Sequence, residues 1–130
     1  MGPCDDRGEV DSGSGFGDGS GRRLLMEAAV LASLAGRAAH GYDLRRALAE
    51  LTGGFMVVES SSIYRLLRRL EQEGLVASSW TEGEYGPQRR QYHLTDDGYS
   101  RLVAWRPQLE ARERAFRLVI EAISRCAATR

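Results

Sequence analysis

Residues 60–74, SSSIYRLLRRLEQEG, combine an apolar stripe with a dense set of polar and basic side chains. Four apolar residues recur at i, i+3, i+4 and i+7, which places them on one core-facing side of a helix: Ile63, Leu66, Leu67 and Leu70. The other side carries the hydroxyl, phenol and guanidinium groups of Ser60, Ser61, Ser62, Tyr64, Arg65, Arg68 and Arg69. Such groups hydrogen-bond to phosphates and to guanine edges, so this helix is a candidate for the major groove of double-stranded DNA.

The same basic residues have a simpler interpretation, namely a helix face that is only exposed to solvent. Glu71 and Glu73 are suitably spaced to form ion pairs with Arg68 and Arg69, which would neutralise part of the face. The pattern also leaves open whether Arg65 or Arg68, if either, contacts a base.

A β-hairpin is predicted directly after this helix. Two strands, at residues 75–81 and 89–94, flank a segment that is dense in turn residues. Arg89 and Arg90 lie just past the tip of this hairpin, where a hairpin beside DNA would meet the backbone phosphates. The hairpin therefore favours the DNA-binding interpretation of the basic helix.

The elements that would position these groups follow from periodicity and capping residues. Ser60 is expected to cap the basic helix, which would cover about residues 61–73. Further helices are predicted at residues 22–36, at about 41–51 and at 96–127. Three helices, a hairpin and a long helix describe a mainly α fold with a small β-hairpin, the winged helix-turn-helix. The third helix is then the recognition helix and the hairpin is the wing.

The charge is distributed unevenly along the chain, which has 18 basic residues, all Arg, and 18 acidic ones. Residues 1–21 contain seven glycines, five acids and one Arg, which predicts a disordered acidic tail. The remainder holds 17 Arg and 13 acids, so its net charge is +4. We expect a DNA-binding domain at residues 22–95 and a dimerisation helix at residues 96–127.

Several function classes are disfavoured by what the sequence contains. Cys4 and Cys126 have no metal-ligand spacing, and no cofactor or metal is expected. No stretch approaches the roughly 20 apolar residues that cross a bilayer, so a cytoplasmic, nucleoid-associated protein is expected. No nucleophile lies beside a paired base, and His40 is expected to be a capping or packing residue. An enzyme is therefore not expected.

Three motifs resemble the PadR family of bacterial transcriptional regulators. They are HGYDL at residues 40–44, SIYRLLRRLEQEGLV at 62–76, and GPQRRQYHLTDDG at 86–98. The resemblance covers about residues 24–123 and points to the family branch with a short C-terminal region. It implies a winged helix-turn-helix domain, a C-terminal dimerisation helix and repression of a nearby promoter.

The resemblance also implies roles for single residues. Tyr64 and Arg90 would lie near DNA phosphates. In some members of this branch, flat aromatic compounds bind in a pore of the dimer, and Trp105 is the candidate for stacking on such an effector. Its possible neighbours in the pore are Leu102, Leu109, Leu24 and Met26. An interface core position for Trp105 is an equally good interpretation.

Heptad spacing in the last helix favours pairing between helices. Residues on this seam, with the apolar side of the first helix, give the predicted dimer interface: Leu24, Leu31, Leu102, Leu109, Phe116, Val119 and Ile123. Pro107 lacks an N–H group, so a kink is expected there. A homodimer would read a pseudo-palindromic operator with half-sites about 34 Å apart. The alternative function is a sensor or sequestering binder of small aromatic molecules.

Overall fold

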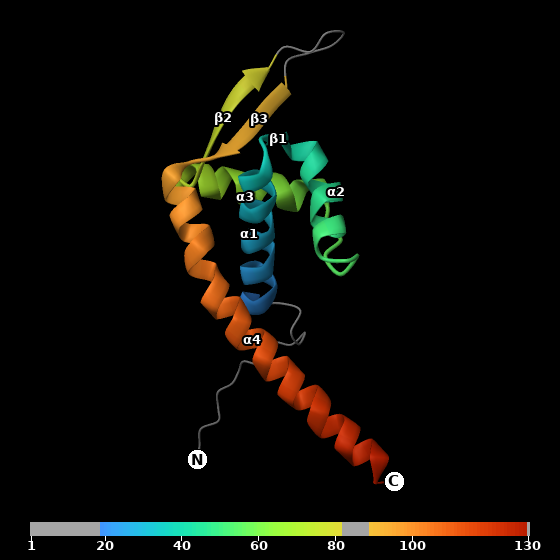
Figure 1. Ribbon diagram of the computed structural model, residues 1–130. Helices are drawn as coiled ribbons and strands as arrows, with labels where there is room; N and C mark the ends of the chain where they lie inside the picture. The colour runs from blue at the N-terminus through green and yellow to red at the C-terminus, as the bar shows by residue number, and fades with distance from the viewer. Residues whose placement is uncertain (1–18, 82–88, 130) are drawn as a thin grey trace, which may run out of the picture.

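The computed structural model describes residues 19–81 and 89–129 of the chain. Its elements, labelled in Figure 1, are α1 (Gly19–Gly36), β1 (Ala39–His40), α2 (Gly41–Leu51), α3 (Ser60–Gln72), β2 (Val76–Thr81), β3 (Arg89–Leu94) and α4 (Asp96–Ala128). The mainly α fold with a small β-hairpin and a long final helix is confirmed.

Two helix starts differ from the prediction. Helix α1 begins at Gly19, so residues 19–21 extend a helix that was expected to start at Arg22. Adding residues to a helix that is already anchored by packing costs far less than nucleating one. Helix α3 begins at Ser60, and Glu59 occupies the N-cap position without a side-chain cap. The expected cap by Ser60 is therefore wrong, because the carbonyl of Glu59 already accepts the first helical hydrogen bonds.

The sheet has three antiparallel strands in the order β1-β3-β2. The hairpin register pairs Val76 with Leu94 and Thr81 with Arg89, so the predicted hairpin is confirmed, with its first strand one residue shorter. Strand β1 was not predicted, since its two residues are too few to show a period of two. The predicted turn segment lies outside the described residues.

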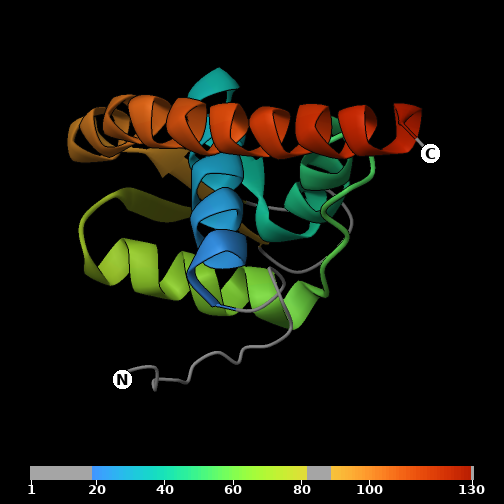
Figure 2. The same ribbon diagram turned by 90° about the horizontal axis from the view of Figure 1, so that it is seen from below.

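The core lies between α1, α2, α3 and the sheet. The predicted apolar stripe of α3 is buried, and the other fully buried large side chains come from α1, α2, the α2–α3 connection and β2: Val30, Leu31, Leu44, Leu48, Met56 and Val76. Figure 2 shows α3 and α4 on opposite sides of α1, so α1 separates these two helices.

Helix α4 starts at a tightly packed junction. The Thr95 hydroxyl oxygen accepts a hydrogen bond from the Gly98 amide at 3.0 Å, which caps the helix. A Cβ atom on Gly98 would lie only 2.0 Å from the carbonyl oxygen of Leu75. This close approach of two backbones explains why glycine follows the two aspartates.

The second half of α4 projects away from the rest of the fold (Figure 1). The helix continues through Pro107, and its axis changes direction along its length in Figure 1. A kink caused by Pro107 itself stays a prediction. None of the helices in residues 19–81 and 89–129 is long and apolar enough to cross a membrane.

Candidate nucleic-acid interface

The outward face of α3 is built on its buried stripe. Because Ile63, Leu66 and the other stripe residues point into the core, the remaining side chains of the first two turns must point outward. Ser61, Tyr64, Arg65 and Arg68 are exposed, while Ser60 and Ser62 are half-buried. The structure thus brings six of the seven predicted α3 residues to one polar surface, which we call the α3 face: Ser60, Ser61, Ser62, Tyr64, Arg65 and Arg68.

Tyr64 is held against the start of α2. A Cβ atom on Gly41 would lie 2.4 Å from Cε1 and 3.1 Å from the hydroxyl oxygen of Tyr64. The aromatic ring therefore occupies space that any residue other than glycine at position 41 would fill. Sequence reasoning missed Gly41, although the HG pair before a helix was a visible signal.

The arginines of α3 separate into two groups. Arg65 makes one long contact, with its Nη2 atom 3.5 Å from the Ser62 hydroxyl, and Arg68 has no hydrogen bond or ion pair within the described part of the chain. Arg69 turns away and pairs with Glu27 at 3.3 Å and Glu73 at 3.2 Å. Arg69 is therefore removed from the proposed DNA contacts, because its guanidinium is already held by two carboxylates.

The wing is tied to α3 by a chain of polar contacts. The Ser78 hydroxyl donates to Glu71 at 2.7 Å and accepts from Nε of Arg90 at 3.0 Å. The Arg90 guanidinium also lies 5.1 Å from the centre of the exposed Trp80 ring, a cation–π distance. Arg89 is exposed beside it. Glu71 thus contacts the wing, and it does not form the ion pair with Arg68 that the solvent-exposed interpretation would require.

The end of β2 that lies nearest the turn segment is joined to β1 at the other edge of the sheet. His40 Nε2 lies 3.1 Å from the Thr81 hydroxyl, and its Nδ1 lies 3.6 Å from an Asp43 carboxylate oxygen. His40 is thus a packing residue, as predicted. Burial raises the pKa of Tyr92 above its ordinary value, and nearby Arg90 opposes this shift. The Tyr92 phenol therefore stays neutral within the sheet.

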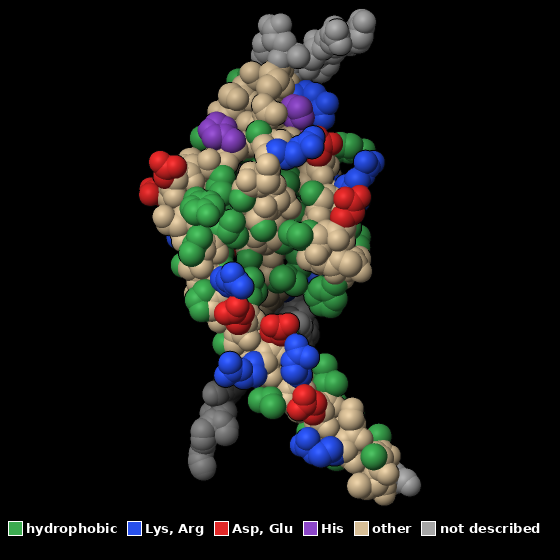
Figure 3. All heavy atoms as spheres, viewed as in Figure 1, with side chains coloured by type: hydrophobic (Ala, Val, Ile, Leu, Met, Phe, Trp, Pro, Cys, Tyr) green, Lys and Arg blue, Asp and Glu red, His purple; other side chains and the backbone are tan. Residues whose placement is uncertain are grey.

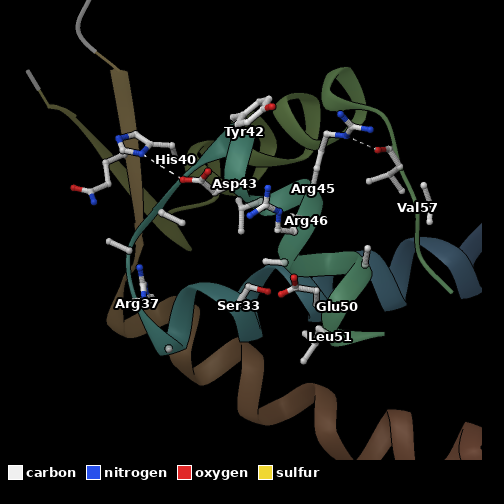
Figure 4. Close-up of a pocket in the computed structure, with 18 residues that line it drawn as sticks. Ser33, Arg37, His40, Tyr42, Asp43, Arg45, Arg46, Glu50, Leu51 and Val57 are labelled. Atoms are coloured by element: carbon white, nitrogen blue, oxygen red, sulfur yellow. Dashed lines mark hydrogen bonds and ion pairs between the residues drawn. The ribbon is translucent and has the colours of Figure 1, made fainter. Parts of the chain in front are cut away.

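A groove of about 1210 Å³ runs along the outer side of α2 (Figure 4). Arg45 in this view donates through Nε to the Val58 carbonyl at 3.2 Å. Tyr42 is 63% exposed and follows Gly41 at the start of α2. Sequence reasoning missed Tyr42 as a surface aromatic, although its place in the HGY triplet was a usable signal.

A second, more apolar pocket of about 700 Å³ lies between α1, the end of α2 and α4. Its wall includes Leu102, Trp105 and Leu109, as predicted for an effector site, together with Leu25 and Phe55. Met26 and Leu24, which were expected as neighbours of Trp105, do not line this pocket. Leu25 lines the pocket from α1 instead, and the effector site stays a prediction.

The predicted dimer residues fall into three groups. Leu102 and Leu109 line the apolar pocket described above. Leu31 is 0% exposed within its own chain, so it is excluded from direct contact with a partner, and Leu24 is nearly buried. Phe116, Val119 and Ile123 are between 50% and 61% exposed on the projecting part of α4. Figure 3 shows hydrophobic and charged side chains mixed along this part of the helix.

Comparisons with known proteins agree with this geometry. The model of the transcriptional regulator PadR-like family matches residues 30–104. A Mycobacterium tuberculosis protein described as a transcriptional regulator is 31% identical over 82 residues, which are 63% of this chain and 43% of that protein. The chain therefore spans less than half the length of this relative.

Solved structures are similar as well. A transcriptional regulator from Thermoplasma acidophilum has a TM-score of 0.65 at 31% identity, over 73% of this chain and 91% of that one. PadR of Bacillus subtilis, solved in complex with operator DNA, has a TM-score of 0.58 at 30% identity, over 62% of this chain and 46% of that one.

Proposed function

The chain belongs to the PadR-like family of transcriptional regulators, and from this premise we propose that it is a homodimeric repressor that binds a pseudo-palindromic operator in double-stranded DNA. The observation that carries this proposal is the α3 face, in which Tyr64, Arg65 and Arg68 stand exposed above a buried apolar stripe. The similarity to a PadR solved with operator DNA supports it.

The α3 face fits the requirements of major-groove binding. The groove is about 12 Å wide and admits one helix whose polar residues come from its first turns. Arg65 and Arg68 can grip guanine in a bidentate manner or contact phosphate, and the serine hydroxyls can donate to phosphate. Arg89 and Arg90 on the wing supply phosphate contacts beside the groove.

The dimer part of the proposal depends on α4. Its projecting half exposes Phe116, Val119 and Ile123, and a second copy would bury them. Two copies paired in this way would present two α3 faces, which suits half-sites about 34 Å apart.

The test is operator binding by a double variant, Arg65→Ala with Arg68→Ala, on a fragment of the gene's own promoter. We expect loss of specific binding, with an unchanged fold and an unchanged oligomeric state. The slope of log affinity against log salt should fall by about one for each lost phosphate contact. The matched control, Arg114→Ala with Arg125→Ala, removes the same charge from exposed positions on α4. Equal affinity of the two double variants would refute the placement of DNA on the α3 face.

A second candidate function, sensing of a small aromatic effector, is favoured by the pocket that contains Trp105. Release of DNA would require the effector to bind one dimer geometry more tightly than the other. In a Trp80→Phe chain, quenching of Trp105 fluorescence by a panel of planar aromatic compounds would support it. No quenching across the panel would leave Trp105 as a packing residue.

A further inference from the structure

Glu27 is a charged residue in an apolar position. It lies three residues after Leu24 and four before Leu31, so it falls on the buried stripe of α1. The residue is only 5% exposed. Charged side chains are almost never buried to this degree unless they are paired, so the partners of Glu27 explain its position.

Three donors from two other helices satisfy the Glu27 carboxylate. Its Oε1 accepts from Nη2 of Arg69 at 3.3 Å, and its Oε2 accepts from Nη1 of Arg101 at 3.0 Å and from the indole Nε1 of Trp105 at 2.8 Å. Glu73 lies 3.2 Å from Arg69 and 3.9 Å from Arg101. Two carboxylates and two guanidinium groups therefore balance in charge, and we call these five residues the Glu27 cluster.

The Glu27 cluster joins the two sites discussed above. Trp105 forms part of the wall of the apolar pocket, and Arg69 follows Arg68 of the α3 face directly. Because α1 lies between α3 and α4, Glu27 is placed to contact both (Figure 2). One buried carboxylate thus touches the pocket wall and the recognition helix at the same time.

We propose that Glu27 is a positioning residue for DNA binding, which couples the orientation of Trp105 to that of α3 through Arg69. Loss of one donor leaves this nearly buried carboxylate with an unsatisfied oxygen, which favours readjustment of its other contacts. Displacement of the Trp105 indole therefore changes the contact between Glu27 and Arg69. Because Arg69 lies on α3, the orientation of the α3 face changes as well. The inference rests on the proposed operator binding and adds how that binding is controlled.

Coupling between two sites is reciprocal, which supplies a direct test. In a Trp80→Phe chain, Trp105 is the sole tryptophan, and we expect its emission to change when operator DNA is added. Adding Glu27→Gln should abolish this change while operator is still bound. The matched control, Glu50→Gln, removes one exposed carboxylate from α2 and should retain it. A merely structural role for Glu27 would leave the response of Trp105 to DNA unaffected in folded protein.

A double-mutant cycle on operator affinity gives an independent test. Trp105→Phe removes the indole N–H but keeps a ring in the pocket wall, and Arg69→Gln removes the guanidinium. We expect their combined effect to differ from the product of the single effects by about fivefold or more, as for coupled sites. With Glu27→Gln present, the effects should multiply. If Glu27→Gln does not fold, the cycle in the chain that retains Glu27 decides alone.

The outcomes separate this inference from the proposed function. If the unmodified chain does not bind the promoter fragment, operator binding itself is refuted. If the chain binds the operator through Arg65 and Arg68, but the cycle is multiplicative and Trp105 emission does not respond to DNA, only the role of Glu27 is refuted.

Discussion

The Gly41→Ala substitution is expected to weaken DNA binding while it leaves the stability of the fold almost unchanged. The added Cβ would lie 2.4 Å from Cε1 of Tyr64, and ordinary contact begins at 3.4 Å, so the ring must move by 3.4 − 2.4 = 1.0 Å. Tyr64 is 40% exposed, so its side chain can swing outward at little cost. Gly41 does not have a positive φ, so alanine fits its backbone and lowers the entropy of the unfolded chain, which offsets part of that cost by about 0.4–1 kcal/mol.

The expected result follows from this balance. The free energy of unfolding should change by less than about 1 kcal/mol. If the Tyr64 hydroxyl donates to a phosphate, loss of that charged hydrogen bond costs about 1.5–3 kcal/mol, which is roughly a 10- to 150-fold weaker operator affinity. Fluorescence anisotropy with labelled promoter DNA measures the affinity, and chemical denaturation measures the stability.

Two comparisons make the test specific. Gly36→Ala is the matched control, since a Cβ atom there meets no atom within 4 Å, and it should leave affinity unchanged. In a Tyr64→Phe chain, Gly41→Ala should have little additional effect on affinity, because both changes remove the same contact. An unchanged affinity for Gly41→Ala would refute the role given to Tyr64.

Three further outcomes are expected. Gly98→Ala should lower the free energy of unfolding by about 1–3 kcal/mol or more, measured in urea, because its Cβ would clash with the backbone carbonyl of Leu75 and not with a movable side chain. Thr95→Ala should cost about 1 kcal/mol in the same assay, through loss of the α4 cap, whereas Thr95→Ser should not. Val119→Glu with Ile123→Glu should shift the protein to monomer in sedimentation, and an unchanged dimer would place the interface elsewhere.

The predictions from the sequence were most accurate for long elements whose apolar residues all lie on one face. Four apolar residues at helical spacing defined the inward side of α3, and the bounds of α2 and β3 were predicted correctly. Neighbouring residues on a helix differ by about 100° in direction, so an error of one position misplaces a side chain. This is why Met26 was assigned to the pocket that Leu25 lines.

The Glu27 cluster could not be predicted from local pattern, because its partners are distant in sequence. Arg69 is 42 residues away, Arg101 is 74 and Trp105 is 78. The signal that existed was the presence of a carboxylate on an otherwise apolar stripe. Such violations of local patterning are expected at functional or strained sites, so a buried carboxylate at this position indicates partners from other elements.

The hydrogen-bond and ion-pair partners of Glu71 and Glu73 distinguish a solvated helix face from a DNA-binding one. Pairing of Glu71 and Glu73 with arginines of α3 would have favoured the solvated face. Glu73 does pair with Arg69, but on the side that meets α1 and α4, and Glu71 accepts from Ser78 of the wing. Arg65 and Arg68 thus have no acidic partner among the described residues. A cationic surface that residues 19–81 and 89–129 do not neutralise attracts a phosphate backbone, and this favours DNA as its counterpart.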